Sequence, residues 1–271
     1  MLKILHKIKT LIYYLKYLPK LDEDIDTMKS RHDISDDVFS AFQQDRDSKS
    51  YLDIYDKVSP LVSCCVATYN RGNLLVERSL KSLLNQTYKN IEVIVIGDHC
   101  TDQTESLINN ISDERLRFIN LTERGSYPKQ QDWRWMVAGT VPVNYALSIA
   151  TGDFITHLDD DDEHMPDRIS KLVKFIQDSR ADFIWHPFWR EYGKRGWQLI
   201  PAERFGKNEL TSSSVFYHNW FKKIPWDINA YMYREPGDWN RFRKIMYLGA
   251  TFKRYPEPLL RHYMERNQVK T

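Results

Sequence analysis

Four consecutive carboxylates, Asp159, Asp160, Asp161 and Asp162, are the residues whose type and spacing point most directly to chemistry. Side chains this close repel one another unless a cation lies among them. A hard divalent ion, held by one or two carboxylates together with substrate phosphates, meets that requirement. The acidic run therefore predicts a site for a metal-bound diphosphate.

Two other interpretations of this run are a solvated acidic loop and a calcium loop. The calcium loop fails on spacing, because counting from Asp159 puts His164 where an EF-hand needs glycine and Ser170 where it needs glutamate. The solvated loop is disfavoured by the context of the run. Residues 152–158 alternate as in a half-buried strand, and residues 169–176 have helical spacing.

Strands and helices are expected to alternate along the chain before the acidic run. Apolar segments at residues 61–67, 91–96 and 116–121 predict buried strands, with helical spacing between them. This order predicts an α/β fold with a doubly wound, mostly parallel sheet, which binds ligands beyond the carboxyl ends of its strands. No G-x-G-x-x-G and no P-loop sequence occurs, so dinucleotide and P-loop enzymes lose their usual sequence support.

The composition narrows the class of protein further. With 271 residues, 42% of them hydrophobic, the chain can form one large domain, and a net charge of +2 does not indicate a nucleic-acid partner. Three cysteines, of which Cys64 and Cys65 are adjacent, provide neither a disulfide framework nor a C-x-x-C metal site. No stretch has the ~20 apolar residues of a membrane span. The expected location is the cytoplasm, including the cytoplasmic face of the membrane.

Residues 1–58 are expected to form a separate N-terminal helical segment. In residues 1–21, leucines and isoleucines share one helical stripe among five lysines, with no acid before Asp22. Such a basic amphipathic helix is typical of docking on an anionic inner membrane surface. The alternative is packing on the rest of the protein or on a second subunit, as in a homodimer. Residues 22–58 predict further polar helices without chemistry.

Residues 59–271 contain four segments that together carry a family resemblance. They are residues 61–71 (LVSCCVATYNR), 84–98 (LNQTYKNIEVIVIGD), 144–153 (NYALSIATGD) and 157–162 (HLDDDD). They resemble the family 2 glycosyltransferases, nucleotide-sugar enzymes of the GT-A fold with a Rossmann-like nucleotide-binding half. The resemblance implies inverting transfer of a sugar from a nucleotide-diphosphate sugar to a saccharide or lipid-linked acceptor in cell-surface glycan synthesis. It also implies Mn²⁺ or Mg²⁺ as cofactor.

The resemblance assigns residues 59–162 to nucleotide-sugar binding. The implied nucleotide-binding residues are Thr68, Tyr69, Asn70, Arg71, Asp98, Asn144, Asp159 and Asp160. Tyr69 would cover the base and Asp98 would accept a hydrogen bond from it, with a helix cap as the alternative for Asp98. Asp161 and His262 would bind the metal, while Asp162 would orient the groups around the ion. A structural role for His262 is the alternative.

The resemblance assigns residues 163–271 to the acceptor and the catalytic base. Inversion needs a base that removes the acceptor hydroxyl proton on the face opposite the leaving nucleotide, and Asp238 occupies that position. The alternative for Asp238 is an N-cap of the following helix. Gly237 stands where the family usually has a first acid, and Glu235 would partly compensate.

Indole rings stack well on sugars, so tryptophans in this half are candidates for acceptor binding. The predicted acceptor-binding residues are Trp185, Trp189, Trp239 and Glu235, with Trp197 as a further candidate. Because buried aromatic residues usually belong to the core, at least two of these four indoles are expected to be core residues. Residues 183–189 and 196–200 are expected to form a hairpin.

One departure from the family pattern concerns the diphosphate. The basic residue that commonly precedes the asparagine at Asn144 is missing, and Arg124, Lys129 and Arg134 are the candidates to replace it. Two alternatives to glycosyl transfer remain. A nucleotidyltransferase or sugar-nucleotide pyrophosphorylase needs a glycine-rich loop after the first strand, which residues 68–72 lack. A catalytically inactive glycan-binding protein would have no need for the retained acids.

Overall fold

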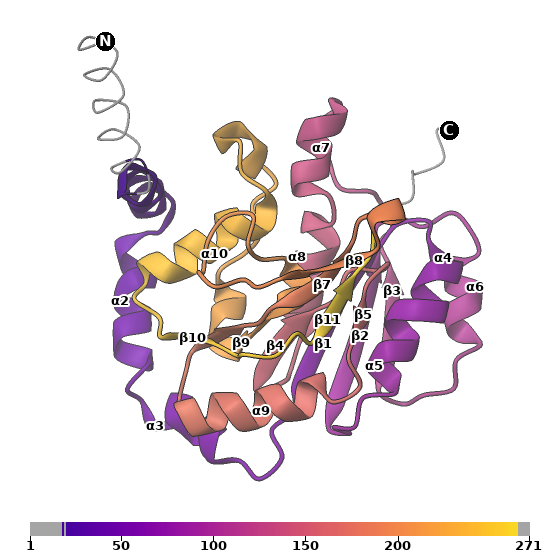
Figure 1. Cartoon of the computed structure of the whole chain (residues 1–271), viewed down its shortest axis with the longest axis horizontal. Coiled ribbons are helices and arrows are strands. Elements are labelled where there is room, and N and C mark those ends of the chain that lie inside the picture. Colours follow the sequence, from indigo (N-terminus) through magenta and orange to yellow (C-terminus); the bar gives the residue numbers. More distant parts are fainter. Residues whose placement is uncertain (1–17, 19, 265–271) are drawn as a thin grey trace, which may run out of the picture.

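The computed structural model describes residue 18 and residues 20–264, which fold around a seven-stranded sheet (Figure 1). The strands lie in the order β10-β6-β9-β4-β1-β2-β3. Their bounds are Val62–Thr68 (β1), Ile91–Gly97 (β2), Leu116–Asn120 (β3), Phe154–His157 (β4), Phe183–Trp185 (β6), Val215–His218 (β9) and Phe252–Arg254 (β10). β1 to β4 run parallel, so their carboxyl ends share one edge of the sheet.

The mostly parallel sheet confirms the predicted α/β architecture. The exception is β9, which runs antiparallel to both β4 and β6. The register between β1 and β2 runs from the pair Val62 and Ile91 to the pair Thr68 and Gly97. Nearly every residue of these two strands is buried, because helices cover both faces of a parallel sheet. This burial explains why their sequences are continuous apolar runs.

A second, four-stranded sheet has the order β5-β11-β7-β8 and was not predicted. Its strands are Glu163–His164 (β5), Phe188–Glu191 (β7), Trp197–Ile200 (β8) and Leu260–His262 (β11). The prediction of one hairpin over residues 183–200 was wrong in part. β7 and β8 do form an antiparallel hairpin, but β6 joins the large sheet between β9 and β10. All three residues of β6 are buried, as a central strand requires, whereas β8 is mostly exposed.

Helices surround the large sheet, as Figure 1 shows. Their bounds are Asp36–Asp45 (α2), Lys49–Leu52 (α3), Gly72–Leu74 (α4), Lys81–Leu84 (α5), Thr104–Asn109 (α6), Gln131–Val137 (α7), Thr140–Ile149 (α8), Arg168–Ser179 (α9) and Gly237–Tyr247 (α10). Shorter 3₁₀ turns are Asp53–Asp56, Gly193–Arg195, Ser212–Ser214, Asn219–Lys223 and Ala230–Tyr233. Between α4 and α5 the helix continues as a π-helix over Leu75–Leu80. α8 packs on β1 and β2, and α9 packs on β6.

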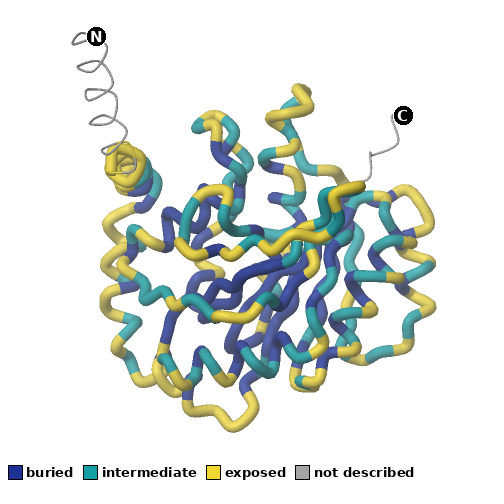
Figure 2. The backbone as a smooth tube through the Cα atoms, viewed as in Figure 1, coloured by how far each residue is buried: buried dark blue, intermediate teal, exposed yellow. Residues whose placement is uncertain are grey.

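The N-terminal segment is helical where the structure describes it, as predicted for residues 22–58. Residues 20–33 form a helix, called the N-terminal helix below, and α2 and α3 follow. Phe42 of α2 is completely buried, with its ring against those of Trp220 and Phe221. Figure 2 shows the buried strands enclosed by helices whose outer surfaces are exposed.

The structure bears only in part on the predicted membrane-docking helix, on membrane spans and on the cysteines. Most of the predicted basic helix of residues 1–21 lies outside the described residues. Among residues 18 and 20–264, no helix has the length and apolar character needed to cross a membrane. Cys64, Cys65 and Cys100 are buried free thiols.

Candidate active site

The acidic run follows β4 and contacts the loop that follows β1. Thr68 Oγ1 donates to Asp160 Oδ2 at 2.7 Å, and the Arg71 guanidinium donates to Asp160 at 3.0 Å and to Asp161 at 2.9 Å. Burial, together with repulsion from Asp162 and Asp160, raises the pKa of Asp161 to about 6 despite Arg71. Four of the predicted site residues thus meet at the carboxyl ends of β1 and β4.

Asp159, Asp162 and His262 form a second group at this edge. One ligand atom from each lies within 4.8 Å of the other two. His262 Nδ1 lies 2.9 Å from Asp162 Oδ2, and Ser212 Oγ donates to Asp159 at 2.8 Å. Burial and repulsion from Asp162 and Asp161 raise the pKa of Asp159 to about 8. A divalent cation would relieve this repulsion, and carboxylate ligands suit Mg²⁺ and Mn²⁺, so the donor set fits the predicted ion.

The two groups divide the predicted metal ligands. His262 lies with Asp159 and Asp162, whereas the carboxylate of Asp161 is paired with Arg71. Burial alone would lower the pKa of His262, but attraction to Asp162 outweighs burial and raises it. Which of the three aspartates ligates an ion stays a prediction. Asp162 is the aspartate whose carboxylate is within hydrogen-bond distance of His262, at 2.9 Å.

The expected base pocket lies at the end of β2. The buried Asp98 carboxylate accepts a hydrogen bond from the backbone N–H of Gly125 at 3.1 Å, and Arg124 Nε lies 3.6 Å from its other oxygen. The Arg124 guanidinium also stacks on Tyr69, with its carbon 3.5 Å from the ring centroid. Arg124 is therefore next to the two residues predicted to hold the base. Asp98 does not cap α6: the N-cap residue is Gln103, and Asp102 accepts from the backbone N–H of Thr104 at 3.0 Å.

The side-chain amides of two predicted nucleotide-binding asparagines form hydrogen bonds with backbone groups of the protein. Asn70 has a positive φ of 51°, and its side-chain oxygen accepts from Thr101 N at 2.8 Å, which ties the loops after β1 and β2 together. Asn144 exchanges two hydrogen bonds with the backbone of Trp226, at 2.9 and 2.8 Å. Both amides shape the site through the backbone, and contact with a nucleotide stays a prediction.

Asp238 lies in the first turn of α10. Its Oδ1 accepts from the backbone N–H of Trp239 at 2.7 Å, while the cap position itself belongs to Pro236. Loss of surrounding water raises the pKa of Asp238 to about 6, although this hydrogen bond and nearby His262 act in the opposite direction. A carboxyl group with this pKa is ionised at neutral pH and is a better proton acceptor than an ordinary aspartate.

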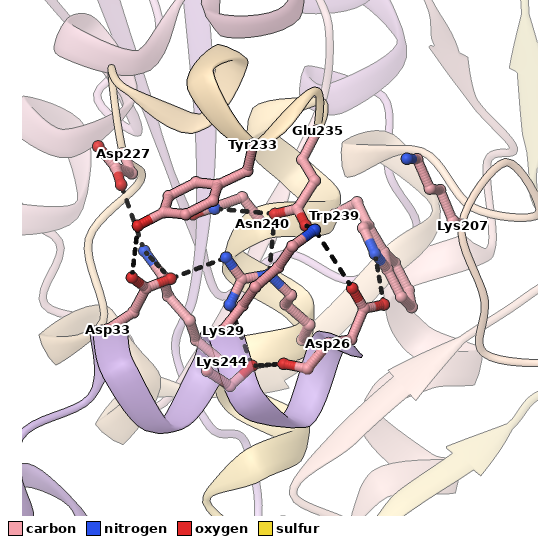
Figure 3. Close-up of polar contacts among 12 residues, drawn as sticks. Asp26, Lys29, Asp33, Lys207, Asp227, Tyr233, Glu235, Trp239, Asn240 and Lys244 are labelled. Carbon is pink, nitrogen blue, oxygen red and sulfur yellow. Dashed lines mark hydrogen bonds and ion pairs between the residues drawn. The ribbon is translucent and has the colours of Figure 1, made fainter. Parts of the chain in front are cut away.

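The predicted acceptor-binding residues separate into buried and accessible members. Trp185 and Trp239 are each 8% exposed, and their indole N–H groups donate to Ala202 O and to Asp26, so two of the indoles are core residues as expected. Trp189 is half-buried on β7, and Trp197 is 40% exposed on β8. The Glu235 carboxylate is held by a network that includes the N-terminal helix (Figure 3).

Comparison with known sequences gives the family. The sequence model described as "Glycosyl transferase family 2" matches residues 63–232. The chain belongs to glycosyltransferase family 2. Its fold is similar to that of S. aureus TarS residues 1–349 solved in complex with UDP-GlcNAc, with a TM-score of 0.60, 19% identity, and coverage of 76% of this chain and 59% of that one.

Curated relatives of this family 2 glycosyltransferase include three with informative names. Glycosyltransferase GlyG of Streptococcus pneumoniae is 26% identical over 200 residues, 72% of this chain and 56% of the relative. The UDP-Glc:alpha-D-GlcNAc-diphosphoundecaprenol beta-1,3-glucosyltransferase WfaP of Escherichia coli is 35% identical over 131 residues (48% and 47%). The GalNAc(5)-diNAcBac-PP-undecaprenol beta-1,3-glucosyltransferase of Campylobacter jejuni is 34% identical over 125 residues (45% and 36%). The chain thus spans about half the length of these relatives or less.

Several residues that hold the site of this glycosyltransferase were not found from the sequence. Ser79 Oγ lies 2.9 and 3.0 Å from the carbonyl oxygens of Asp159 and Asp162, and Arg78 donates to the carbonyl of Asp161 at 2.5 Å. Both belong to the π-helix, a feature often found at functional sites and without a sequence signal in this chain.

Arg168 supports the acidic run from the other side. It is completely buried, and it donates to His186, Thr156 and the carbonyls of Ser213 and Val215. The segment that Arg168 holds carries Ser212 and Ser213. The Ser212 hydroxyl donates to the Asp159 carboxylate, and the Ser213 hydroxyl accepts from the backbone N–H of Asp159. The helical spacing after the run marked Arg168 only as a residue of the first turn of α9.

Proposed function

We propose that this protein is a metal-dependent, inverting glycosyltransferase that moves a sugar from a nucleoside-diphosphate sugar to a lipid-linked saccharide. The observation that carries the proposal is the grouping of Asp159, Asp162 and His262 at the carboxyl edge of the sheet. The acidic run that supplies the two aspartates also contacts Thr68 and Arg71, which are predicted nucleotide residues at the end of β1. The charge of the same His262 also acts on Asp238, whose pKa is raised by burial and lowered in part by His262.

Mn²⁺ or Mg²⁺ is the proposed cofactor. Asp159, Asp162 and His262 would hold the ion, with Asp161 as the further candidate. The ion would supply positive charge next to the diphosphate, where negative charge develops as the sugar leaves. Arg71 neutralises part of the acidic run without the ion, since it pairs with both Asp160 and Asp161. Thr68, Tyr69 and Asp98 would orient the nucleoside.

Asp238 is the proposed general base. The acceptor hydroxyl oxygen attacks the anomeric carbon, the bond from that carbon to the diphosphate breaks, and the hydroxyl proton passes to the Asp238 carboxylate. Attack opposite the leaving group inverts the configuration, and no covalent enzyme intermediate is needed. Because the pKa of Asp238 is about 6, the group is mostly ionised at pH 7 and ready to accept this proton.

The names of the relatives support uridine as the donor base and a diphosphate-linked lipid as the acceptor carrier. The E. coli and C. jejuni relatives are both named as beta-1,3-glucosyltransferases, and both names contain an undecaprenol diphosphate. For this chain we propose UDP-glucose or another UDP-sugar as donor. Trp189 and Trp197 have accessible indole surface to stack on the acceptor saccharide. Residues 1–21 would place the enzyme on the cytoplasmic membrane face, where such acceptors lie.

Thermal-shift measurements test the donor and metal requirement together. UDP, GDP, UDP-glucose and UDP-N-acetylglucosamine are added with Mn²⁺, with Mg²⁺ or with EDTA. Stabilisation by a uridine nucleotide that EDTA abolishes supports the proposal. Equal stabilisation with EDTA would overturn the metal site, and no stabilisation by any of these nucleotides would overturn the donor site.

Turnover separates the proposal from its two alternatives. The substrates are UDP-glucose and a synthetic polyprenyl diphosphate carrying N-acetylglucosamine. The expected product is UDP, formed together with a lengthened lipid-linked saccharide. Release of inorganic pyrophosphate in the presence of a sugar phosphate and UTP would instead indicate a nucleotidyltransferase. Acceptor binding with no UDP release from any donor would indicate an inactive glycan-binding protein.

A further inference from the structure

The N-terminal helix contacts the segment that carries Asp238 through charged and polar side chains (Figure 3). Lys29 Nζ lies 2.6 Å from Glu235 Oε1, which is the shortest of these contacts. Asp26 accepts a hydrogen bond from the indole of Trp239 at 3.2 Å. Asp33 pairs with Arg243 of α10 at 2.7 Å. Three successive turns of one helix therefore reach residues on both sides of Asp238.

Glu235 is the central residue of this network. Its side chain is 1% exposed, and its second carboxylate oxygen accepts from Arg243 Nε at 2.8 Å and from Asn240 at 3.1 Å. Burial alone would raise the pKa of Glu235, but the hydrogen bonds from Lys29 and Arg243 outweigh burial and lower it. The carboxylate is therefore a fixed charge, and it is held by the N-terminal helix on one side and by α10 on the other.

The N-terminal helix has little apolar attachment that could replace these contacts. Its large apolar residues are exposed: Leu21 by 53%, Ile25 by 39% and Met28 by 72%. Surface helices usually bury their apolar stripe and expose their polar one. This helix does the reverse, so the ion pairs and hydrogen bonds of its other face fix its position on the protein.

The link between Glu235 and Asp238 is short. Only Pro236 and Gly237 separate them, and Pro236 stands at the cap of α10 with its ring restricting φ. Glu235 is also bonded to α10 itself, through Arg243 and Asn240. A displacement of Glu235 is therefore passed to the first turn of the helix, where Asp238 lies.

From these contacts we infer that the N-terminal helix is a positioning element for the catalytic base, acting through the Lys29–Glu235 ion pair. This inference rests on the proposed function, because it takes Asp238 as the base. Lys29 and Glu235 are positioning residues here, which touch neither donor nor acceptor in the proposed reaction. The role previously considered for Glu235, acceptor binding, would leave its pairing with Lys29 unexplained. Both partners lie outside residues 63–232, the region that the family model matches.

The test compares Lys29→Met and Lys29→Arg with Gln43→Ala in the full chain. Gln43 of α2 donates to the carbonyl of Leu248 at 2.7 Å, so it ties the N-terminal segment to the C-terminal end of α10, opposite to the end that carries Asp238. The first measurement is hydrogen exchange of the backbone amides of Glu235 and residues 237–241. Lys29→Met is expected to speed exchange there, whereas Lys29→Arg and Gln43→Ala are expected to leave it unchanged.

The second measurement is turnover of UDP-glucose with the lipid-linked acceptor. Lys29→Met is expected to lower kcat by about tenfold or more, since small displacements of a catalytic group have effects of this size. The Kd for UDP should stay within about twofold of the wild-type value, because the donor residues do not contact the network. Lys29→Arg should restore most of kcat. If Lys29→Met does not fold, Lys29→Gln is read in the same way.

The possible results separate the two claims. Unchanged exchange in Lys29→Met overturns the positioning role whatever the activity, and so does faster exchange with unchanged kcat. A loss of kcat in Gln43→Ala as large as in Lys29→Met also overturns it, because the effect would then follow general loosening of α10. If the wild-type chain releases no UDP from any donor, the proposed function fails first, and the inference about Lys29 fails with it.

Discussion

The raised pKa of Asp238 gives a quantitative prediction about pH. A carboxyl group with a pKa of about 6 is about 90% ionised at pH 7, half ionised at pH 6 and about 10% ionised at pH 5. If only the carboxylate accepts the acceptor proton, kcat should fall about tenfold from pH 7 to pH 5. An aspartate at the ordinary value of 3.8 would lose less than a tenth of its ionised form over that range.

The same group affects stability with a definite sign. The pKa of Asp238 is raised on folding by about 2 units, so the folded protein binds a proton there more tightly than the unfolded chain. Stability should then fall as pH rises from about 4 to about 6, by at most about 3 kcal/mol. Asp238→Asn removes this cost at pH 7 and keeps an oxygen for the N–H of Trp239. We expect this variant to have a higher Tm and a kcat lowered by about 100-fold or more.

The assay is steady-state UDP release between pH 5 and pH 8 at saturating donor and Mn²⁺, with melting curves of the same samples. Asp178→Asn is the matched control, since Asp178 is an exposed aspartate of α9 that pairs on the surface with Lys174, one turn earlier in the same helix. Its profile and Tm should match the wild type. A rate that stays flat to pH 5 would refute the raised pKa, and a higher Tm with unchanged kcat in Asp238→Asn would remove Asp238 from catalysis.

Three further predictions concern the groups around the acidic run. Arg168→Met should lower the free energy of unfolding, measured by urea titration, by about 2 kcal/mol, because the buried side chain of His186 loses its hydrogen-bond donor. The control Arg180→Met, at an exposed arginine, should change the free energy of unfolding by less than about 0.5 kcal/mol. Equal effects of the two substitutions would contradict this account. His262→Ala should weaken the Mn²⁺-dependent part of the thermal shift by UDP about tenfold in apparent Kd, and an unchanged Kd would exclude it as a ligand. Arg124→Ala should weaken UDP binding measured by calorimetry, also about tenfold; unchanged affinity would show that its guanidinium does not contact the nucleotide.

The large sheet could be predicted because its strands are buried on both faces and therefore appear as apolar runs. β1, β2 and β3 were found within a residue or two for this reason. The small sheet could not be predicted, because β5 has two residues and pairs with β11 almost a hundred residues later. Strands this short have no periodicity to detect, and their pairing depends on tertiary contacts.

The residue types of the candidate site were visible in the sequence, but their pairing was not. The acidic run indicated a charged site. The aspartate that turns toward His262 is selected by the turn after β4 and by the backbone N–H of Tyr263, which donates to Asp162. Glu235 stood next to the predicted base, but its partner Lys29 lies 206 positions away. Local patterns carry no information about such long-range ion pairs.

The π-helix of Leu75–Leu80 has a consequence for how this protein tolerates length changes. A π-helical stretch is in effect one residue inserted into an α-helix, and each residue turns an α-helix by about 100°. Deleting one residue in this stretch would let the helix become regular, which favours its own backbone hydrogen bonding. The same deletion would rotate Arg78 and Ser79 away from the carbonyls of Asp159 and Asp161. The shortened chain would keep a regular helix and would lose the hydrogen bonds from this helix to the backbone of the acidic run.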